Sequence, residues 1–390
     1  MLPRADHRPF RPLPRAATHN REPHSDRSHT RPSLRVQLRM LLLVLQTLVL
    51  MVACTSTQSA ATRSVSLLGP GVINDPKNKS LRFDILKFGL KSFCDEMQNQ
   101  GVALRLSSDH PVAGRFFARA CQADVIDDDT NRNLTLKFAG IGYTWTNLTG
   151  RVGFDVLGTL ELLPDFQLAA DHSMYVYFRT SRLDIPRFKV TLVESNIARS
   201  AALLSNTDPE KIGREIMQSQ LSRGFTVIRL NDSGQTEFGP GLLELGQHPY
   251  HPFNVASNDV VLVNERTEIH RGQQDFIGAF KIDGNSKALA LAISVDGAPG
   301  VNVAVISAAQ AQPLLDRYVH NAGPVSLVEP PRYIQNVAYG SLFRQTVPVP
   351  EGTYYILLQH LSTQGSWSVS SPGDDRAAKV DYLLQMADAP

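Results

Sequence analysis

The sequence lacks the cysteine content of a small disulfide-stapled scaffold, and it has few aromatic residues. Its 390 residues include three cysteines and two tryptophans, and Phe, Trp and Tyr together make up 7%. Long apolar runs are also missing: the uncharged stretch 40–53 has 14 residues, whereas a membrane-spanning helix needs about 20. A small scaffold held by disulfides or metal and a permanent transmembrane helix are therefore both disfavoured.

Signatures of catalysis and cofactor binding are missing too. The sequence has no phosphate-binding loop and no dinucleotide-binding fingerprint. The segment Asp232-Ser233-Gly234 lacks the strand-to-helix G-x-S-x-G context of a nucleophile and predicts a hairpin turn. His248 and His251 have no third ligand close in sequence, so they do not predict a metal site. We expect a protein that is not an enzyme and has no cofactor, although a hydrolase built from dispersed residues stays open.

The charge of the chain is close to balanced. The whole sequence has 39 basic and 37 acidic residues, a formal net charge of +2. Nine arginines and three acidic residues lie in 1–53, so 30 basic and 34 acidic residues remain, a net charge of −4. This balance predicts no affinity for nucleic acid. The arginine-rich composition of the first 39 residues is typical of a nucleic-acid tail or a transit peptide. Alternatively, translation begins near Leu34 or Met40, which leaves a short basic flank before the apolar stretch.

The apolar stretch ends in Met51-Val52-Ala53-Cys54. A basic flank, a short apolar core and a small residue before cysteine resemble the lipobox of bacterial lipoproteins, with Met51 where leucine is usual. The resemblance implies that Cys54 becomes the first mature residue and carries acyl chains, each buried methylene contributing about 0.8 kcal/mol. In enteric-type lipoproteins, Thr55 in place of aspartate implies release to the outer membrane. An ordinary secretory signal with a chance cysteine is the alternative.

Composition divides the chain into four regions. They are a basic leader and lipoprotein signal peptide (1–53), a Ser/Thr/Ala-rich flexible tether (54–71), an α+β domain (72–250) and an all-β sandwich domain (251–390). The 337 residues after position 53 suffice for about two domains with their own cores. The expected fold class is an antiparallel sheet with two amphipathic helices, followed by a jelly-roll-like sandwich.

Short segments with alternating apolar residues predict the strands. In the α+β domain they are residues 101–106, 134–145, 151–163, 173–179, 188–194 and 224–230, with a turn at 109–114. In the last domain they recur about every ten residues from 259 to 386, with a helix at 308–319, which is typical of a sandwich or jelly roll. Val349–His360, VPEGTYYILLQH, resembles the penultimate strand of β-sandwich modules at the C-terminal end of secreted bacterial proteins.

The two predicted helices cover residues 81–101 and 208–224. Apolar residues recur at helical spacing in the first, at Phe83, Leu86, Leu90, Phe93, Cys94 and Met97. A long helix on a curved antiparallel sheet resembles tubular lipid-binding domains, which hold acyl chains between helix and sheet. The resemblance implies that Phe83, Leu86, Leu90 and Phe93 line an apolar ligand. A helix-on-sheet core without a ligand fits the same pattern.

Cys94 and Cys121 are the cysteines that remain beside Cys54. An even pair in an exported protein is a disulfide candidate, which for this loop length would contribute roughly 3 to 4 kcal/mol. Two buried thiols are the alternative.

From location and domain organisation we expect a non-enzymatic, membrane-anchored envelope lipoprotein that binds an apolar ligand, such as a lipid, or an envelope component. The alternative is a protein- or glycan-recognition module acting through the C-terminal sandwich, by an edge strand or loops.

Overall fold

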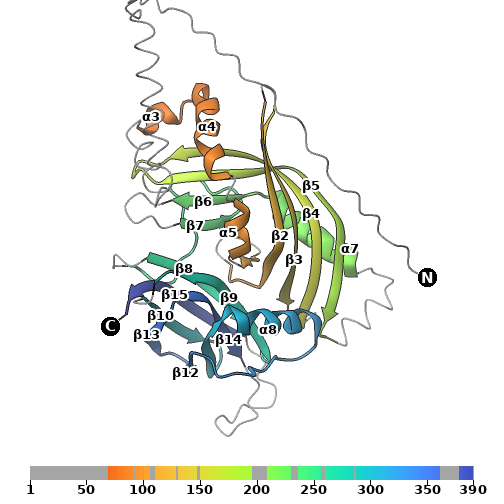
Figure 1. The fold of residues 1–390 in the computed structure, drawn as a ribbon, viewed down its shortest axis with the longest axis vertical. Coiled ribbons are helices and arrows are strands. Elements are labelled where there is room, and N and C mark those ends of the chain that lie inside the picture. The colour runs from red at the N-terminus through yellow and green to blue at the C-terminus, as the bar shows by residue number, and fades with distance from the viewer. Residues whose placement is uncertain are drawn as a thin grey trace, which may run out of the picture. The chain divides into compact units, whose positions relative to one another are not determined.

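A computed structural model describes residues 69–90, 93–99, 101–105, 110–128, 131–146, 150–195, 209–229, 236–255, 260–284, 287–360 and 377–389. All of them belong to one compact unit, Ser56–Pro390. The expected signal peptide, Cys54 and all but the last residues of the tether lie outside the described residues. The described part is mostly β-structure in antiparallel sheets, as the sequence predicts (Figure 1). None of its helices has the length and apolar character needed to cross a bilayer.

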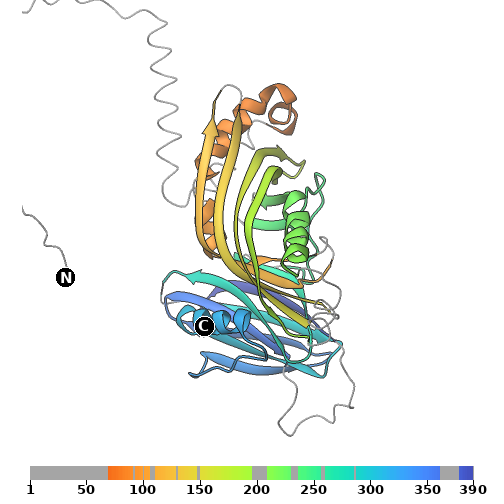
Figure 2. The same cartoon turned by 90° about the vertical axis from the view of Figure 1, so that its right-hand side faces the viewer.

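Seven antiparallel strands form the first sheet, and their order in space is their order in the chain. They are β1 (Val102–Ala103), β2 (Gly114–Asp127), β3 (Arg132–Thr146), β4 (Gly150–Leu168), β5 (Met174–Val193), β6 (Phe225–Arg229) and β7 (Thr236–Pro240). Long, strongly curved central strands dominate the sheet (Figure 2). In β4 every even-numbered residue from 154 to 168 is buried and every odd one is at least partly exposed. One face of the sheet therefore lies on a core.

Helices cover that inner face. They are α3 (Pro70–Ile73), the 3-10 turn η2 (Pro76–Asn78), α4 (Lys79–Leu90), α5 (Phe93–Asn99) and α7 (Pro209–Ser222). The prediction of a single helix over 81–101 is wrong, because α4 ends at Leu90 and α5 is a separate element. Gly89 lies in the last turn of α4, and glycine weakens a helix because it loses the most backbone entropy.

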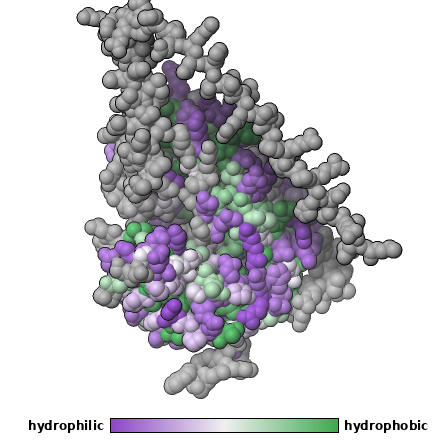
Figure 3. Space-filling model, in the orientation of Figure 1, coloured by the Kyte–Doolittle hydropathy of each residue, from purple (hydrophilic) through white to green (hydrophobic). Residues whose placement is uncertain are grey.

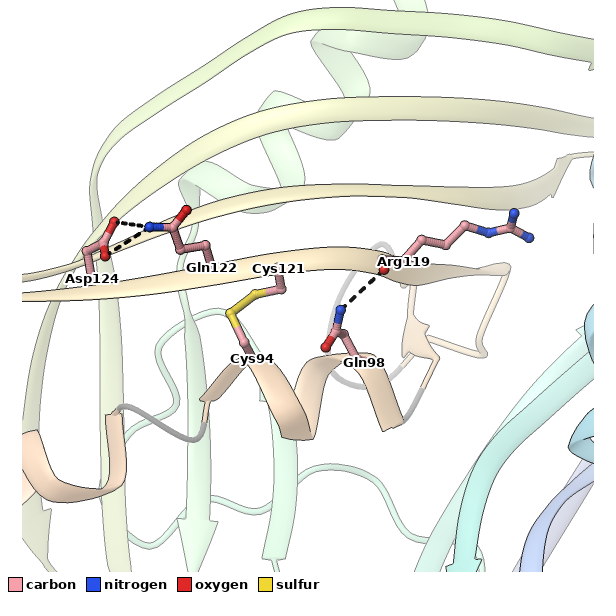
Figure 4. The surroundings of a disulfide bond; sticks show 6 residues. All are labelled: Cys94, Gln98, Arg119, Cys121, Gln122 and Asp124. Carbon is pink, nitrogen blue, oxygen red and sulfur yellow. Dashed lines mark hydrogen bonds between the residues drawn. A yellow bond between two sulfur atoms is a disulfide. The ribbon is translucent and has the colours of Figure 1, made fainter. Parts of the chain in front are cut away.

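A disulfide joins the predicted pair Cys94 and Cys121, whose Cα atoms are 5.3 Å apart. It connects α5 to β2, and near it the Gln98 side chain donates to the Arg119 carbonyl (Figure 4). Strand β2 corrects the sequence analysis, which placed no strand between the turn at 109–114 and residue 134. The first five residues of β2 are all buried, and a register shift follows Ala118, so β2 lacks the two-residue alternation that predicts a strand.

Two four-stranded sheets form the C-terminal sandwich, with strand orders β13-β10-β15-β8 and β12-β11-β14-β9. The strands are β8 (Val260–Ile269), β9 (Gln273–Ile282), β10 (Lys287–Asp296), β11 (Gly300–Ser307), β12 (Tyr333–Ala338), β13 (Leu342–Val349), β14 (Gly352–His360) and β15 (Ala378–Asp388). Aliphatic side chains from both sheets fill the space between them. Seven of these strands match predicted segments, whereas β12 was not predicted.

Helix α8 (Ala308–His320) lies where the sandwich meets the ends of β2 to β5 (Figure 1). A capping box between Ser307 and Gln310 begins it. Its buried residues share one core with Tyr143 and Trp145 of β3 and with Phe276 of β9. The first sheet and the sandwich are therefore joined by a common apolar cluster.

Candidate functional site

The four predicted ligand-lining residues all contact the core between helices and sheet. Phe83 and Leu90 are buried, and Leu86 and Phe93 are partly buried against the same cluster. The Phe93 ring centroid lies 5.2 Å from that of Phe178. These side chains pack onto protein groups, as the side chains of a helix-on-sheet core do.

A buried polar cluster, which we term the junction network, joins the first sheet to the sandwich. Arg115 of β2 donates from Nε to Asp275 Oδ1 of β9 at 2.8 Å and from Nη2 to the Tyr382 hydroxyl at 2.7 Å. The Tyr143 hydroxyl donates to Asp275 Oδ1 at 2.8 Å, and the Tyr382 hydroxyl donates to Glu265 Oε2 at 2.7 Å. Five strands thus meet in one set of charge-assisted hydrogen bonds.

Ionisation in the junction network follows from burial and charge. Burial raises the pKa of Tyr143 and of Tyr382 well above the ordinary value, so both stay neutral donors. Burial disfavours the charged form of Glu265, but Arg105 and Arg115 outweigh it and lower the pKa of this carboxyl. Arg115 and Asp275 have at most 3% exposed side chains. The network therefore forms a buried link between the first sheet and the sandwich.

A second buried arginine fixes α8 to the first sheet. The guanidinium carbon of Arg151 lies 3.7 Å from the ring centroid of Tyr318, a close cation–π contact. Its Nη2 donates to Glu194 Oε1 at 3.2 Å and to the Asn321 carbonyl at 2.8 Å. Burial raises the pKa of Tyr318 to about 12. This arrangement is also structural, because Arg151 is fully buried.

The two histidines of the segment after β7 meet at one carboxylate. His248 Nδ1 lies 2.8 Å from Glu237 Oε2, and His251 Nδ1 lies 3.7 Å from Glu237 Oε1. His248 Nε2 is 3.2 Å from the Tyr175 hydroxyl. Burial lowers the pKa of His251. Within the described residues, no group of three or more His, Cys, Asp or Glu side chains is arranged to hold a metal ion.

A shallow polar pocket of about 190 Å³ lies on the outer face of β4 and β5. Its lining residues are Thr159, Glu161, Arg182 and Asp184. Arg182 Nη1 and Glu161 Oε1 are 3.8 Å apart across it. Four polar groups without an apolar wall do not resemble a small-molecule site, which is mainly apolar.

The sandwich has four outer strands, and the segments that flank β1 bond to two of them. At β8, the Val112 amide donates to the Arg266 carbonyl at 2.8 Å, and the Glu268 amide donates to the Val112 carbonyl at 3.1 Å. At β9, the Gly101 amide donates to the Gly278 carbonyl at 2.7 Å. Strands β12 and β13 are the outer strands at the opposite ends of the same two sheets.

Exposed apolar residues gather beside β12 and β13. Four of the five most exposed large hydrophobic residues of the described chain are Val328, Ile334, Tyr339 and Leu342, each more than half exposed. The rings of Tyr333 and Phe343 stack between the two strands. Figure 3 shows hydrophobic areas among hydrophilic ones on the face of the sandwich drawn there. We call residues 328–343 the sandwich edge.

Sequence analysis missed the sandwich edge because β12 has one fully buried residue, Val337. A usable signal was present: YIQNVA has no charged residue, no proline and no glycine, which is the composition of a strand that pairs readily. The junction network gave no such signal, since its charged members, Arg115, Glu265 and Asp275, are of types that are mostly exposed when taken singly.

Comparisons with known proteins add little. No protein-family model matches the sequence, and no curated protein matches it. A solved structure from Bacillus endospore appendages, which form a novel family of disulfide-linked pili, is 15% identical. The match covers 35% of this chain and 98% of that chain, with a TM-score of 0.18. A TM-score of this size does not establish a shared fold.

Proposed function

We propose that this chain is a non-enzymatic, lipid-anchored protein of the bacterial cell envelope, which binds another protein through its sandwich edge. The observation that carries the proposal is the concentration of exposed apolar side chains on and beside β12 and β13, the two outer strands at the ends of the sandwich sheets away from β8 and β9. Exposed strand edges and apolar patches are the usual sites of protein recognition.

The sandwich belongs to the jelly-roll class in this proposal. Its support is the strand order: β8, β15, β10 and β13 form one sheet, and β9, β14, β11 and β12 form the other. Successive strands mostly cross between the sheets, which is the connectivity of two Greek keys wound together. This class presents its edges and loops for recognition, so it suits a binding module.

Anchoring rests on Cys54 and the apolar stretch before it. Metabolic labelling with an alkyne palmitate, followed by fractionation, tests it: the wild type and the matched variant Ser56→Ala should carry the label and sediment with membranes. Cys54→Ala should lose both properties. Equal labelling of all three proteins would contradict the anchor and leave the sandwich edge unaffected.

Binding of an acyl chain between helices and sheet is the second candidate. Its support is the position of the amphipathic elements α4, α5 and α7 over the inner face of β2 to β5. An acyl chain would have to displace packed aromatic groups, among them Phe93, Phe178 and Phe225, and we therefore rank it below protein binding. Native mass spectrometry of the purified full chain would reveal a co-purified lipid mass if this candidate holds.

Site-specific photo-crosslinking in living cells tests the sandwich edge directly. A photoreactive side chain at Tyr339 or Leu342 should form adducts with a protein. The same group at Leu163, an exposed apolar residue on the outer face of β4, is the matched control and should form none. Adducts at Leu163 alone, or at no position, would overturn the proposal.

A further inference from the structure

We infer that the protein bound at the sandwich edge is a second copy of this chain, paired antiparallel through β12 about a two-fold axis. This inference rests on the proposed function and names its partner. It would join β9-β14-β11-β12 of each copy into one eight-stranded sheet. The four outer strands of the sandwich differ in a way that selects β12 for this role.

Among these four strands, β12 has the fewest features that oppose pairing with its own copy. Strands β8 and β9 already bond to Val112 and Gly101, which lie on either side of β1. Strand β13 carries Arg344 and Pro348, and such residues protect an edge because the charge repels and proline lacks a donor. Strand β12 contains no charged residue and no proline, so its own copy meets neither repulsion nor a missing donor.

Backbone geometry places Asn336 at the centre of such a pair. The Tyr339 amide donates to the Pro299 carbonyl, and residues 333 to 338 pair with 305 to 300. Because an antiparallel strand turns alternate residues toward each neighbour, Val337 and Gln335 direct their backbone groups to β11. Ile334, Asn336 and Ala338 direct theirs away from β11, and Asn336 is the middle one. The Asn336 carbonyl accepts from Gln335 Nε2 at 3.2 Å and the Ala338 carbonyl from Ser341 Oγ at 2.7 Å, and each oxygen keeps a second lone pair for a bond to another copy.

A row of amide side chains crosses the sheet and ends at this residue. Gln359 of β14 is the partner of Asn302 of β11, which is the partner of Asn336. Asn336 Nδ2 donates to Asn302 Oδ1 at 2.8 Å. A primary amide has two donor hydrogens and an acceptor oxygen, so the exposed Asn336 can extend the row to Asn336 of a second copy. This self-complementarity is what a two-fold interface requires.

The area of the proposed contact is small, so we expect the two copies to associate weakly. With Asn336 on the axis, residues 334 to 338 pair with 338 to 334 of the other copy. Five paired residues with Tyr339 and Leu342 at the margin lie at the low end of interface sizes, where complexes are weak and transient. Anchoring in one membrane would raise the effective concentration of the copies and favour pairing. We therefore expect a dimer that depends on protein concentration.

Charge exchange at one position tests the pairing. In the full chain purified in detergent, sedimentation analysis should show a concentration-dependent dimer for the wild type. Asn336→Lys alone and Asn336→Asp alone should each weaken association about tenfold or more, because two like charges then face each other. An equimolar mixture of the two variants should associate again, as a heterodimer. Gln345→Lys on β13 is the control and should associate like the wild type.

The outcomes separate this inference from the proposed function. A monomeric wild type, or variants that associate as well as the wild type, or a mixture that does not recover, would overturn pairing through Asn336. If photo-crosslinks at Tyr339 then lead to a different protein, the proposed function stands with another partner. If Tyr339 gives no crosslink, both fail. Thermal unfolding of each variant checks the fold, which should not change because Asn336 is exposed.

Discussion

The outer strands at the two ends of the sandwich sheets differ in what lies beside them. Strands β8 and β9 border the first sheet, with Glu265 and Asp275 inside the junction network and backbone bonds to Val112 and Gly101. Strands β12 and β13, at the other ends, carry exposed apolar residues instead. One end is closed by charge and hydrogen bonding within the chain, and the other has no strand beside it among the described residues.

This difference indicates that the end at β8 and β9 contributes to the stability of the fold, whereas the end at β12 and β13 is available for recognition. Buried charges are costly unless they are fully paired, so removal of one partner at the closed end should lower the stability of the fold. Substitutions on an exposed edge usually change stability little, so the sandwich edge can be specialised for a partner. Three predictions test this contrast, and a fourth, on the disulfide, gives the size of a covalent link for comparison.

The largest effect should come from breaking the junction network at Asp275. Replacement by alanine leaves the Arg115 guanidinium buried without its carboxylate, and removing one partner of a buried pair typically costs about 3–5 kcal/mol. The matched control is Asp381→Ala: its bidentate pair with Arg266 is partly exposed, so water can take its place, and its loss should cost clearly less than that of Asp275. Urea unfolding of the full chain measures both. Equal losses would contradict a special role for the closed end.

The disulfide should contribute the next largest amount. The Cys94→Ala/Cys121→Ala double variant should unfold with a free energy lower by roughly 3 to 4 kcal/mol, because the unfolded chain regains the freedom of the closed loop. Addition of a reductant to the wild type should reproduce the loss and have no effect on the double variant. A double variant as stable as the oxidised wild type would show that packing of α5 on β2 suffices.

Sequence reasoning worked where one face of an element is buried and the other is not. The strand predicted at 151–163 lies within β4, and the helix predicted at 308–319 corresponds to α8, Ala308–His320. Tyr143 and Trp145, which alternate along a predicted strand, are buried in a core. In each case the spacing of apolar residues reports directly on local structure.

Sequence reasoning failed where the burial of a residue depends on distant parts of the chain. Arg115 and Asp275 are 160 residues apart, and nothing in a single sequence pairs two such positions. Strand β2 is buried on both sides near its start because α8 and the sandwich cover it there, which removes the alternation. The sandwich edge escaped notice for the opposite reason, since β12 has almost no buried residues.

Acid should weaken the closed end through Glu265. The ordinary pKa of this carboxyl is 4.5, and in the folded protein it is lower. The stabilisation is therefore fully present above pH 4.5 and is lost as the pH falls through the lower, folded value. Glu265→Gln should lose about 1.5–3 kcal/mol at neutral pH, as expected for a hydrogen bond to a charged group. Urea titrations at decreasing pH should show the gap to wild type narrowing below pH 4.5, and a constant gap would contradict the assignment.

The smallest effect on the free energy of unfolding should come from a substitution at the sandwich edge. Ile334→Lys changes an exposed side chain of β12, so the free energy of unfolding should stay within about 0.5 kcal/mol of the wild type. Val337 on the same strand is buried in the sandwich core, and Val337→Ala should cost about 2 kcal/mol because it removes buried methyl groups and leaves a cavity. The two variants thus separate the faces of one strand. If Ile334→Lys destabilised the chain as much as Val337→Ala, the edge would be part of the folding core, and it could not serve as a surface reserved for a partner.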